Sequence, residues 1–156
     1  MGSNKIILPI IFAYMLFFPI IAYAYMLLPI VEVYDGDTIK THMDSRLPEP
    51  LNKVSVRIKG IDTPEMPAKS YAETGKLGRA ECVEEAEKAI KAKEFVQMMA
   101  IGFKKMKVDN FDWGTYGGRI VGDVKIGGVD VADALIKEGL AVPYDGKSAK
   151  THNWCE

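Results

Sequence analysis

The chain has 156 residues, of which 48% are hydrophobic, and its formal net charge is −1. This near balance argues against a protein that coats nucleic acid through bulk positive charge, although a local basic cleft remains compatible with it. The length corresponds to one domain with enough apolar residues for a single core, and the sequence contains no internal repeat or low-complexity segment.

The beginning of the chain has the composition of an export signal. A single charge at Lys5 is followed by a long apolar run and an A-x-A pattern that ends at Ala24. These features predict a signal peptide, residues 1–24, that is cleaved after Ala24. An uncleaved membrane anchor is the alternative, because the apolar run continues to Val33 and about 20 residues can span a bilayer. In both cases we expect residues 25–156 to fold outside the cytoplasm, either in the periplasm or as a secreted domain.

The segment that follows predicts a three-stranded antiparallel meander. Residues 28–34 and 38–43 are rich in apolar and β-branched side chains, and the Asp-Gly-Asp sequence between them is typical of a tight turn. After a proline-containing loop at 44–52, residues 53–60 alternate between apolar and polar side chains. The apolar side of this third strand contains Val54, Val56 and Ile58.

The meander is followed by a stretch, residues 61–78, that has the period of neither a helix nor a strand. Loops of this length in compact domains are usually functional or disordered. Periodicity then predicts a helix over 79–100, strands over 104–111 and 118–126, and a second helix over 130–139.

The second predicted helix has a start signal at Asp130 and a stop signal at Gly139. The order of three strands, a helix, two strands and a helix predicts a mainly β, α+β fold. We expect a five-stranded Greek-key barrel of the OB type with two to three helices. A parallel α/β fold is not expected, because strands and helices do not alternate along the chain.

Two acidic clusters lie at predicted strand ends. The first contains Asp35 and Asp37 around a glycine, and the second contains Asp62 and Glu65 around Thr63 and Pro64. Carboxylates and backbone carbonyls that converge in this way suit a hard cation such as Ca²⁺ or Mg²⁺. Zinc is disfavoured, because the two histidines are isolated and the two cysteines lack ligand spacing.

Arginine is scarce in this chain, with four residues against sixteen lysines, and two of the four lie near the acidic clusters. Arg57 stands on the polar side of the third predicted strand, and Arg119 enters the fifth. The planar, permanently charged guanidinium suits the recognition of phosphate oxygens. Carboxylates, a hard cation and two arginines together are the parts needed for phosphoryl transfer. Each part also has a structural interpretation, as a hairpin turn, a helix cap or a solvent-exposed strand arginine.

Taken together, the segments "VYDGDTIK", "VRIKGIDTPE", "GGRIVGDV" and "ALIKEGLA" resemble the staphylococcal nuclease (thermonuclease) family in order and approximate spacing. The resemblance runs from about Ile30 to the C-terminus. The ending "GLAVPYDGK…WC" is similar to a short, exported bacterial branch of that family.

The resemblance implies a calcium-dependent endonuclease that hydrolyses DNA and RNA with low sequence specificity and leaves 3′-phosphate ends. It implies that Asp37, Asp62 and the carbonyl of Thr63 bind Ca²⁺, while Asp35 lies outside the direct ligands. Glu65 would be the general base. Arg57 and Arg119 would bind the scissile phosphate, and Tyr116 and Tyr144 would contact the substrate, although core packing is an equal expectation for each tyrosine.

One departure from the family pattern concerns the approach to Arg119. The family usually has an aromatic residue, one glycine and the arginine, whereas this chain has Tyr116-Gly117-Gly118-Arg119. A one-residue shift reverses the side of a strand on which a side chain lies. We expect a glycine bulge to absorb the extra residue and to keep Arg119 in the site.

The two cysteines, Cys82 and Cys155, favour a disulfide, because an even count in an exported chain usually means pairing. The similarity to the exported branch supports this pair, and two unpaired thiols are the alternative. We expect a monomer without an obligate protein partner, acting on single-stranded or denatured DNA and RNA.

Two competing functions are compatible with parts of the sequence. A non-catalytic OB-fold module would bind single-stranded nucleic acid or a protein partner, and such modules lose the acids or arginines that are still present here. A metal nuclease of the D…E-x-K type would need a Glu-x-Lys strand, but the sequence contains no such triplet, and Asp123-Val124-Lys125 is the nearest match.

Overall fold

The computed structural model of the chain describes residues 24–49, 52–115, 117–147 and 152–156. Except for Ala24, the predicted signal peptide lies outside the described residues, and so does Tyr116. Within the described ranges, no helix combines the length and the apolar character needed to cross a bilayer.

The described residues form nine strands and three helices, which confirms a mainly β, α+β fold. The strands are β1 (Tyr25–Pro29), β2 (Glu32–Val33), β3 (Thr38–His42), β4 (Lys53–Ile58), β5 (Ile61–Asp62), β6 (Lys105–Trp113), β7 (Arg119–Ile126), β8 (Val129–Asp130) and β9 (Val142–Pro143). The helices are α2 (Tyr71–Thr74), α3 (Val83–Ala100) and α4 (Val131–Lys137).

The main sheet has the strand order β1-β6-β7-β4-β3-β2, with β8 paired to β7. Strands β4 and β7 are parallel and the other pairs are antiparallel. Strands β1 and β2 lie at opposite ends of this order, yet only Ile30 and Val31 separate them in the chain. The Ile30 N–H donates to the Lys104 carbonyl and the Val31 N–H donates to the Lys40 carbonyl, at 3.0 Å each. The sheet therefore curls into the OB type, but its ladder is not closed into a barrel.

The first strand of the predicted meander differs from the observed structure. Instead of one strand over 28–34 that pairs with the next, the chain forms β1, which pairs with β6, and the short β2, which pairs with β3. The split occurs at Pro29 and the two residues after it. Because proline cannot donate a backbone hydrogen bond, it is suited to a strand end where the chain changes partner.

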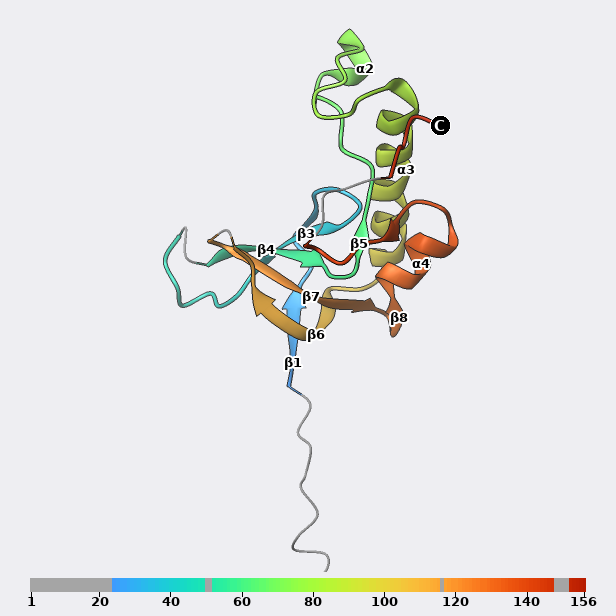
Figure 1. Cartoon of the computed structure of the whole chain (residues 1–156). Coiled ribbons are helices and arrows are strands. Elements are labelled where there is room, and N and C mark those ends of the chain that lie inside the picture. Colours follow the sequence, from blue (N-terminus) through green and yellow to red (C-terminus); the bar gives the residue numbers. More distant parts are fainter. Residues whose placement is uncertain (1–23, 50–51, 116, 148–151) are drawn as a thin grey trace, which may run out of the picture.

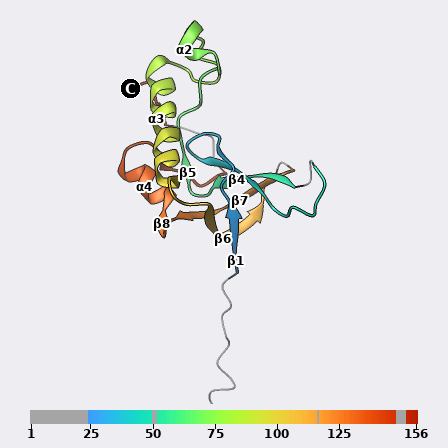
Figure 2. The same cartoon turned by 180° about the vertical axis from the view of Figure 1, so that it is seen from behind.

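Strand β4 confirms the predicted alternation. Val54, Val56 and Ile58 are buried, while the side chains between them face the opposite side of the sheet. Helix α3 buries Ala86, Ala89, Ala92 and Val96, and the last two belong to the main hydrophobic core. Figure 1 shows α3 standing beside the sheet with α4 next to it, and Figure 2 shows the chain after β3 projecting on the side away from α3.

Helix α3 begins at Val83, four residues after the predicted start at Arg79. The residue before it, Cys82, has an extended backbone and acts as N-cap, and Gly78 has a φ of +65° that is incompatible with a helix. The start of α4 is as predicted, because the Asp130 side chain accepts hydrogen bonds from the backbone N–H groups of Ala132 and Asp133.

The C-terminal residues lie along α3, as Figure 1 shows. Cys155 forms a disulfide with Cys82 at the start of the helix. Trp154 is 7% exposed. The ammonium group of Lys88 lies 5.7 Å from the centre of the Trp154 ring and donates to the Trp154 carbonyl at 3.3 Å. The tail is thus held to α3 by the disulfide, by the burial of Trp154 and by the contacts of Lys88 with Trp154.

Candidate functional site

The Asp-Gly-Asp turn between β2 and β3 is pressed against two other segments. A Cβ atom at Gly36 would lie 2.9 Å from the Cβ of Ala92 in α3 and 3.1 Å from a methyl group of Thr63. Gly36 is therefore required for close packing, and its φ is not in the left-handed region. This contact brings the first acidic cluster beside the second, as we expected from their positions at strand ends.

The two acids of the turn have different environments. Asp35 is partly exposed, and its Oδ1 accepts a hydrogen bond from the Asp37 N–H at 3.2 Å, which stabilises the turn. Asp37 is 2% exposed, and its Oδ1 accepts hydrogen bonds from the Thr38 hydroxyl and the Arg57 guanidinium, both at 2.9 Å. Asp35 thus supports the turn, whereas Asp37 is aimed at the sheet.

The Asp37 carboxyl has a strongly perturbed pKa. Its pKa is raised from the ordinary value of 3.8 to about 7, chiefly by burial and also by the nearby charge of Asp35, although Arg57 and Thr38 act in the opposite direction. The negative charge of Asp37 is therefore only partly compensated by the residues around it. A cation bound at this carboxylate would stabilise the ionised form.

The two predicted phosphate-binding arginines lie on the same side of the sheet. Arg57 is paired with Thr38 across β3 and β4, and Ser55 is paired with Arg119 across the parallel strands β4 and β7. Arg57 and Ser55 are two positions apart on β4, so they share one side. Arg57 and Arg119 therefore both face away from the core, on neighbouring strands.

The extra glycine before Arg119 lies in the turn between β6 and β7. Gly118 has a φ of +77°, and β7 begins at Arg119. The irregularity in the β6–β7 ladder lies elsewhere, between Asp109 and Asp112. At the glycines the structure thus has a turn before the strand begins, in place of the expected bulge, and Arg119 lines the cleft.

The second acidic cluster follows the short strand β5, which pairs with β9. Asp62 and Thr63 are 3% and 4% exposed. The side chain of Glu65 is 36% exposed and forms an ion pair with Arg79, whose Nε lies 3.3 Å from the Glu65 Oε2. The backbone N–H of Glu65 donates to the buried Glu85 carboxylate at 3.0 Å. Glu65 is therefore fixed through its backbone while its side chain remains accessible.

These residues meet in a cleft of about 890 Å³. The predicted residues that line it are Asp37, Arg57, Thr63, Glu65, Arg119 and Tyr144, together with Asp35 of the turn. Asp62 is buried beside Thr63 and is not one of the lining residues, and Tyr116 lies outside the described residues. Of the residues that the structure describes, no three or more His, Cys, Asp or Glu side chains gather closely enough to hold a metal by themselves.

Sequence reasoning missed several residues at the cleft. Arg79, Lys40 and Tyr34 line it, and the Lys40 ammonium lies 4.8 Å from the centre of the Tyr34 ring. Arg79 could have been identified as a candidate from the sequence, because the chain has only four arginines and two of them were already assigned to the site. Glu85, which contacts the Glu65 backbone but does not line the cleft, was also missed, although it interrupts a stripe of small apolar residues at helical spacing.

Comparison of the amino-acid sequence with known protein families supports the same interpretation as the geometry of the cleft. Residues 55–154, well over half of the chain, match the family model described as staphylococcal nuclease homologue. The matched segment contains Arg57, Glu65, Arg119 and Cys82, while Asp37 precedes it and Cys155 follows it. No curated protein matches the chain. The extent of the family match and the cleft between the two acidic clusters lead to one conclusion: the chain belongs to the staphylococcal nuclease family.

Proposed function

We propose that this protein is a calcium-dependent endonuclease that hydrolyses the phosphodiester bonds of DNA and RNA and leaves 3′-phosphate ends. One observation carries the proposal. A single cleft gathers Asp37, Arg57, Thr63, Glu65 and Arg119 from four separate segments of the chain. Carboxylates, a general base candidate and two guanidinium groups on one cleft wall are the groups that phosphodiester hydrolysis requires.

The residues present fit a calcium ion. Asp37 supplies a buried carboxylate whose charge is only partly compensated, and Asp62 and the Thr63 carbonyl would supply further oxygen ligands. Such a donor set contains oxygen only, which suits Ca²⁺ better than zinc. When bound, the ion would polarise a phosphate oxygen and neutralise part of the charge that develops in the transition state.

The remaining steps belong to residues of this chain. Arg57 and Arg119 bind the phosphate from the sheet and stabilise the added negative charge on its oxygens. Glu65 accepts a proton from the attacking water as the new oxygen–phosphorus bond forms. The bond between phosphorus and the 5′ oxygen breaks, the 5′ oxygen takes a proton from solvent and leaves as a hydroxyl group, and the phosphate stays on the 3′ side.

The cleft also supports low sequence specificity. Its walls carry arginine and lysine for phosphates and the aromatic rings of Tyr34 and Tyr144, and these groups contact parts that every nucleotide shares. Because the overall charge is slightly negative, attraction of long nucleic acids depends on this local set. We expect binding to be sensitive to salt and to favour single strands, whose bases are free to stack.

Export is part of the proposal. Disulfides persist in oxidising compartments, and the Cys82–Cys155 bond therefore supports a secreted or periplasmic location for the domain. We propose that the domain acts there as a monomer, with nucleic acid as its only required partner.

The function is tested with the domain of residues 25–156 and denatured DNA or RNA, with added Ca²⁺ or with EGTA. We expect cleavage with Ca²⁺, products that carry 3′-phosphates, and loss of cleavage in EGTA. Cleavage that persists in EGTA would contradict the calcium assignment. Binding of single strands without cleavage under any of these conditions would instead favour the non-catalytic OB-fold module.

A further inference from the structure

The Glu85 carboxylate is buried and bonded to two backbone amides that come from different segments. Its Oε1 accepts the N–H of Glu65 at 3.0 Å, and its Oε2 accepts the N–H of Glu81 at 2.6 Å. The residue is 5% exposed, although glutamate is rarely buried unless it is paired. Both carboxylate oxygens are thus used to hold the backbone.

Glu85 lies in the first turn of α3, where the helix macrodipole and free N–H groups favour a negative charge. Burying a carboxylate is costly, and hydrogen bonds from amides offset part of that cost. An alanine at this position would continue the apolar stripe of the helix. The glutamate instead links α3 to the loop that carries Glu65.

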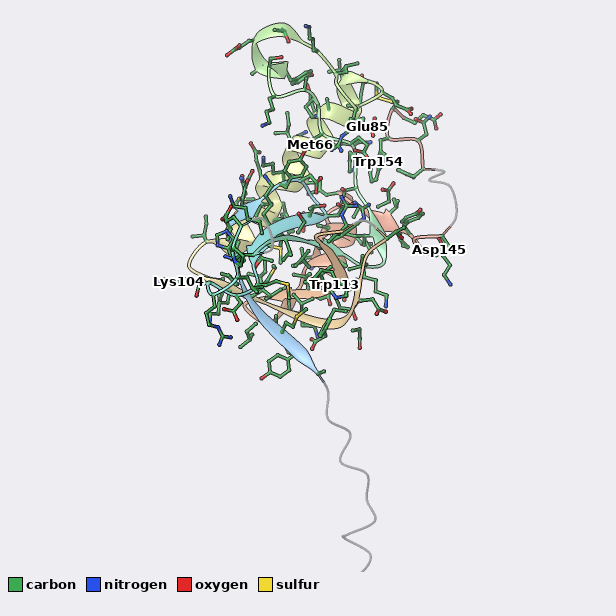
Figure 3. The ribbon with its side chains drawn as sticks, turned by 90° about the vertical axis from the view of Figure 1, so that its left-hand side faces the viewer. Met66, Glu85, Lys104, Trp113, Asp145 and Trp154 are labelled. Atoms are coloured by element: carbon green, nitrogen blue, oxygen red, sulfur yellow. A yellow bond between two sulfur atoms is a disulfide. The ribbon has the colours of Figure 1, made fainter. Side chains whose placement is uncertain are left out.

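The N-terminal end of α3 is itself fixed to the C-terminal tail. The Glu85 N–H donates to the Cys82 sulfur at 3.3 Å, and Cys82 is bonded to Cys155. In Figure 3, Glu85 and Trp154 lie at the same end of α3, close to Met66, which follows Glu65 in the chain. The tail therefore fixes the helix end on which Glu85 stands.

The loop around Glu65 has little regular structure of its own. Residues 63–70 form neither helix nor strand, and the exposed fractions of the Glu65 and Arg79 side chains are 36% and 58%. An ion pair this exposed contributes little rigidity. The hydrogen bond from the Glu65 backbone to Glu85 connects this point of the loop to a buried side chain of α3.

We propose that Glu85 is a positioning residue that fixes the position of Glu65 in the cleft through the hydrogen bond to the Glu65 backbone. The Cys82–Cys155 disulfide in turn fixes the end of α3 that carries Glu85. The proposal rests on the proposed function, because it assigns to Glu65 the task of accepting a proton from water. Displacement of a reacting group by about 1 Å can reduce a rate roughly 100-fold, so a positioning residue affects turnover more than binding.

The test is the Glu85→Gln variant, which keeps the side-chain shape but removes the charge and one acceptor. Glu84→Gln is the matched control, because Glu84 is exposed and lies in the same first turn of α3. Steady-state cleavage of a short single-stranded DNA gives kcat and KM. Hydrogen exchange of the metal-free protein reports on residues 61–70 independently of cleavage.

For Glu85→Gln we expect kcat to fall roughly 10- to 100-fold with KM changed less than about twofold. Amide exchange should become faster in residues 61–70 and remain unchanged in β4 and β7. Glu84→Gln should behave like the wild type in both measurements.

Two outcomes would overturn the positioning role. One is wild-type kcat and wild-type loop exchange in Glu85→Gln, and the other is faster exchange in the sheet and the loop alike, which would mean general destabilisation. If the wild-type protein itself fails to cleave with Ca²⁺, the proposed function fails, and the exchange of the metal-free protein then decides the positioning role alone.

Discussion

The two walls of the cleft are built in different ways. On one wall, Arg57 and Arg119 stand on neighbouring strands whose backbones are joined in a parallel ladder. On the other wall, Glu65 stands on a loop that is connected to the molecule through Glu85 and, behind it, the Cys82–Cys155 disulfide. The sheet wall is fixed by many repeated backbone hydrogen bonds, whereas the loop wall depends on a few individual contacts.

This difference separates the two tasks that we assign to the cleft. Binding a phosphate needs charges at fixed positions, and a strand ladder supplies such positions at little entropic cost. Proton transfer needs a carboxylate at hydrogen-bond distance from a water molecule, and a loop can be adjusted to reach it. A change in the sheet wall should therefore affect chemistry without affecting stability, while loss of the disulfide behind the loop wall should affect both.

The largest effect on activity is expected from Arg119→Lys in the sheet wall. A lysine keeps the charge but loses the planar pair of donors that a phosphate can accept. We expect cleavage to fall about 100- to 1000-fold, with a thermal midpoint close to that of the wild type. Arg46→Lys is the control, because Arg46 is an exposed arginine paired with Asp44 outside the cleft. Wild-type activity in Arg119→Lys would mean that Arg119 does not contact the phosphate.

A smaller effect is expected from pH, through Asp37 between the two walls. The pKa of Asp37 is raised from 3.8 to about 7 in the folded protein. Between these two pH values the folded state therefore holds a proton on Asp37 that the unfolded state has lost. Calcium must displace that proton, so its affinity should rise about tenfold per pH unit up to about pH 7 and then level off. Calcium titrations at several pH values measure this slope.

The same shift predicts how the calcium-free protein responds to pH. The stability contribution of Asp37 should be most favourable below its unfolded pKa of 3.8 and should decrease as the pH rises through about 7. Asp37→Asn cannot ionise, so it should lack this decrease.

For the calcium titrations, an affinity that does not change between pH 5 and pH 7 would contradict the assignment of Asp37 as a ligand.

The smallest effect on activity is expected behind the loop wall, from Cys155→Ser. The disulfide closes a loop with a sequence separation of 73 residues, and its loss should lower the free energy of unfolding by about 4 kcal/mol in the chain-entropy model. At a temperature where the variant remains folded, we expect cleavage to fall only severalfold. Mass spectrometry of the unreduced wild-type protein should find the two cysteines linked, and alkylation of both would reject the bond.

Local patterns predicted much of the sheet wall. The alternation in β4 is a property of consecutive residues, so it identified both the buried valines and the outward-facing Arg57. The cap at Asp130 is equally local, because its partners are two and three residues away. By contrast, the pairing of β1 with β6 joins segments that are far apart in sequence, and no periodicity encodes which strand will be the partner.

The loop wall was less accessible to sequence reasoning for the same physical reason. Its length and irregular composition indicated a functional loop, and the DTPE motif identified Glu65 as a candidate. The hydrogen bond between Glu65 and Glu85 joins two residues that are 20 positions apart through a backbone N–H, a group that every residue except proline possesses. Only the acidic residue in an apolar helical stripe hinted that such a contact exists.

The contact at Gly36 has a consequence for the width of the cleft. The acidic turn, Thr63 and α3 meet at a point where a single methyl group would lie 2.9 Å from Ala92. The space that a side chain would fill at this position is occupied instead by the neighbouring elements. The two acidic segments can therefore approach this closely only because Gly36 has no Cβ atom. A side chain at this position would collide with Ala92 and Thr63, and it would widen the cleft by pushing the two segments apart.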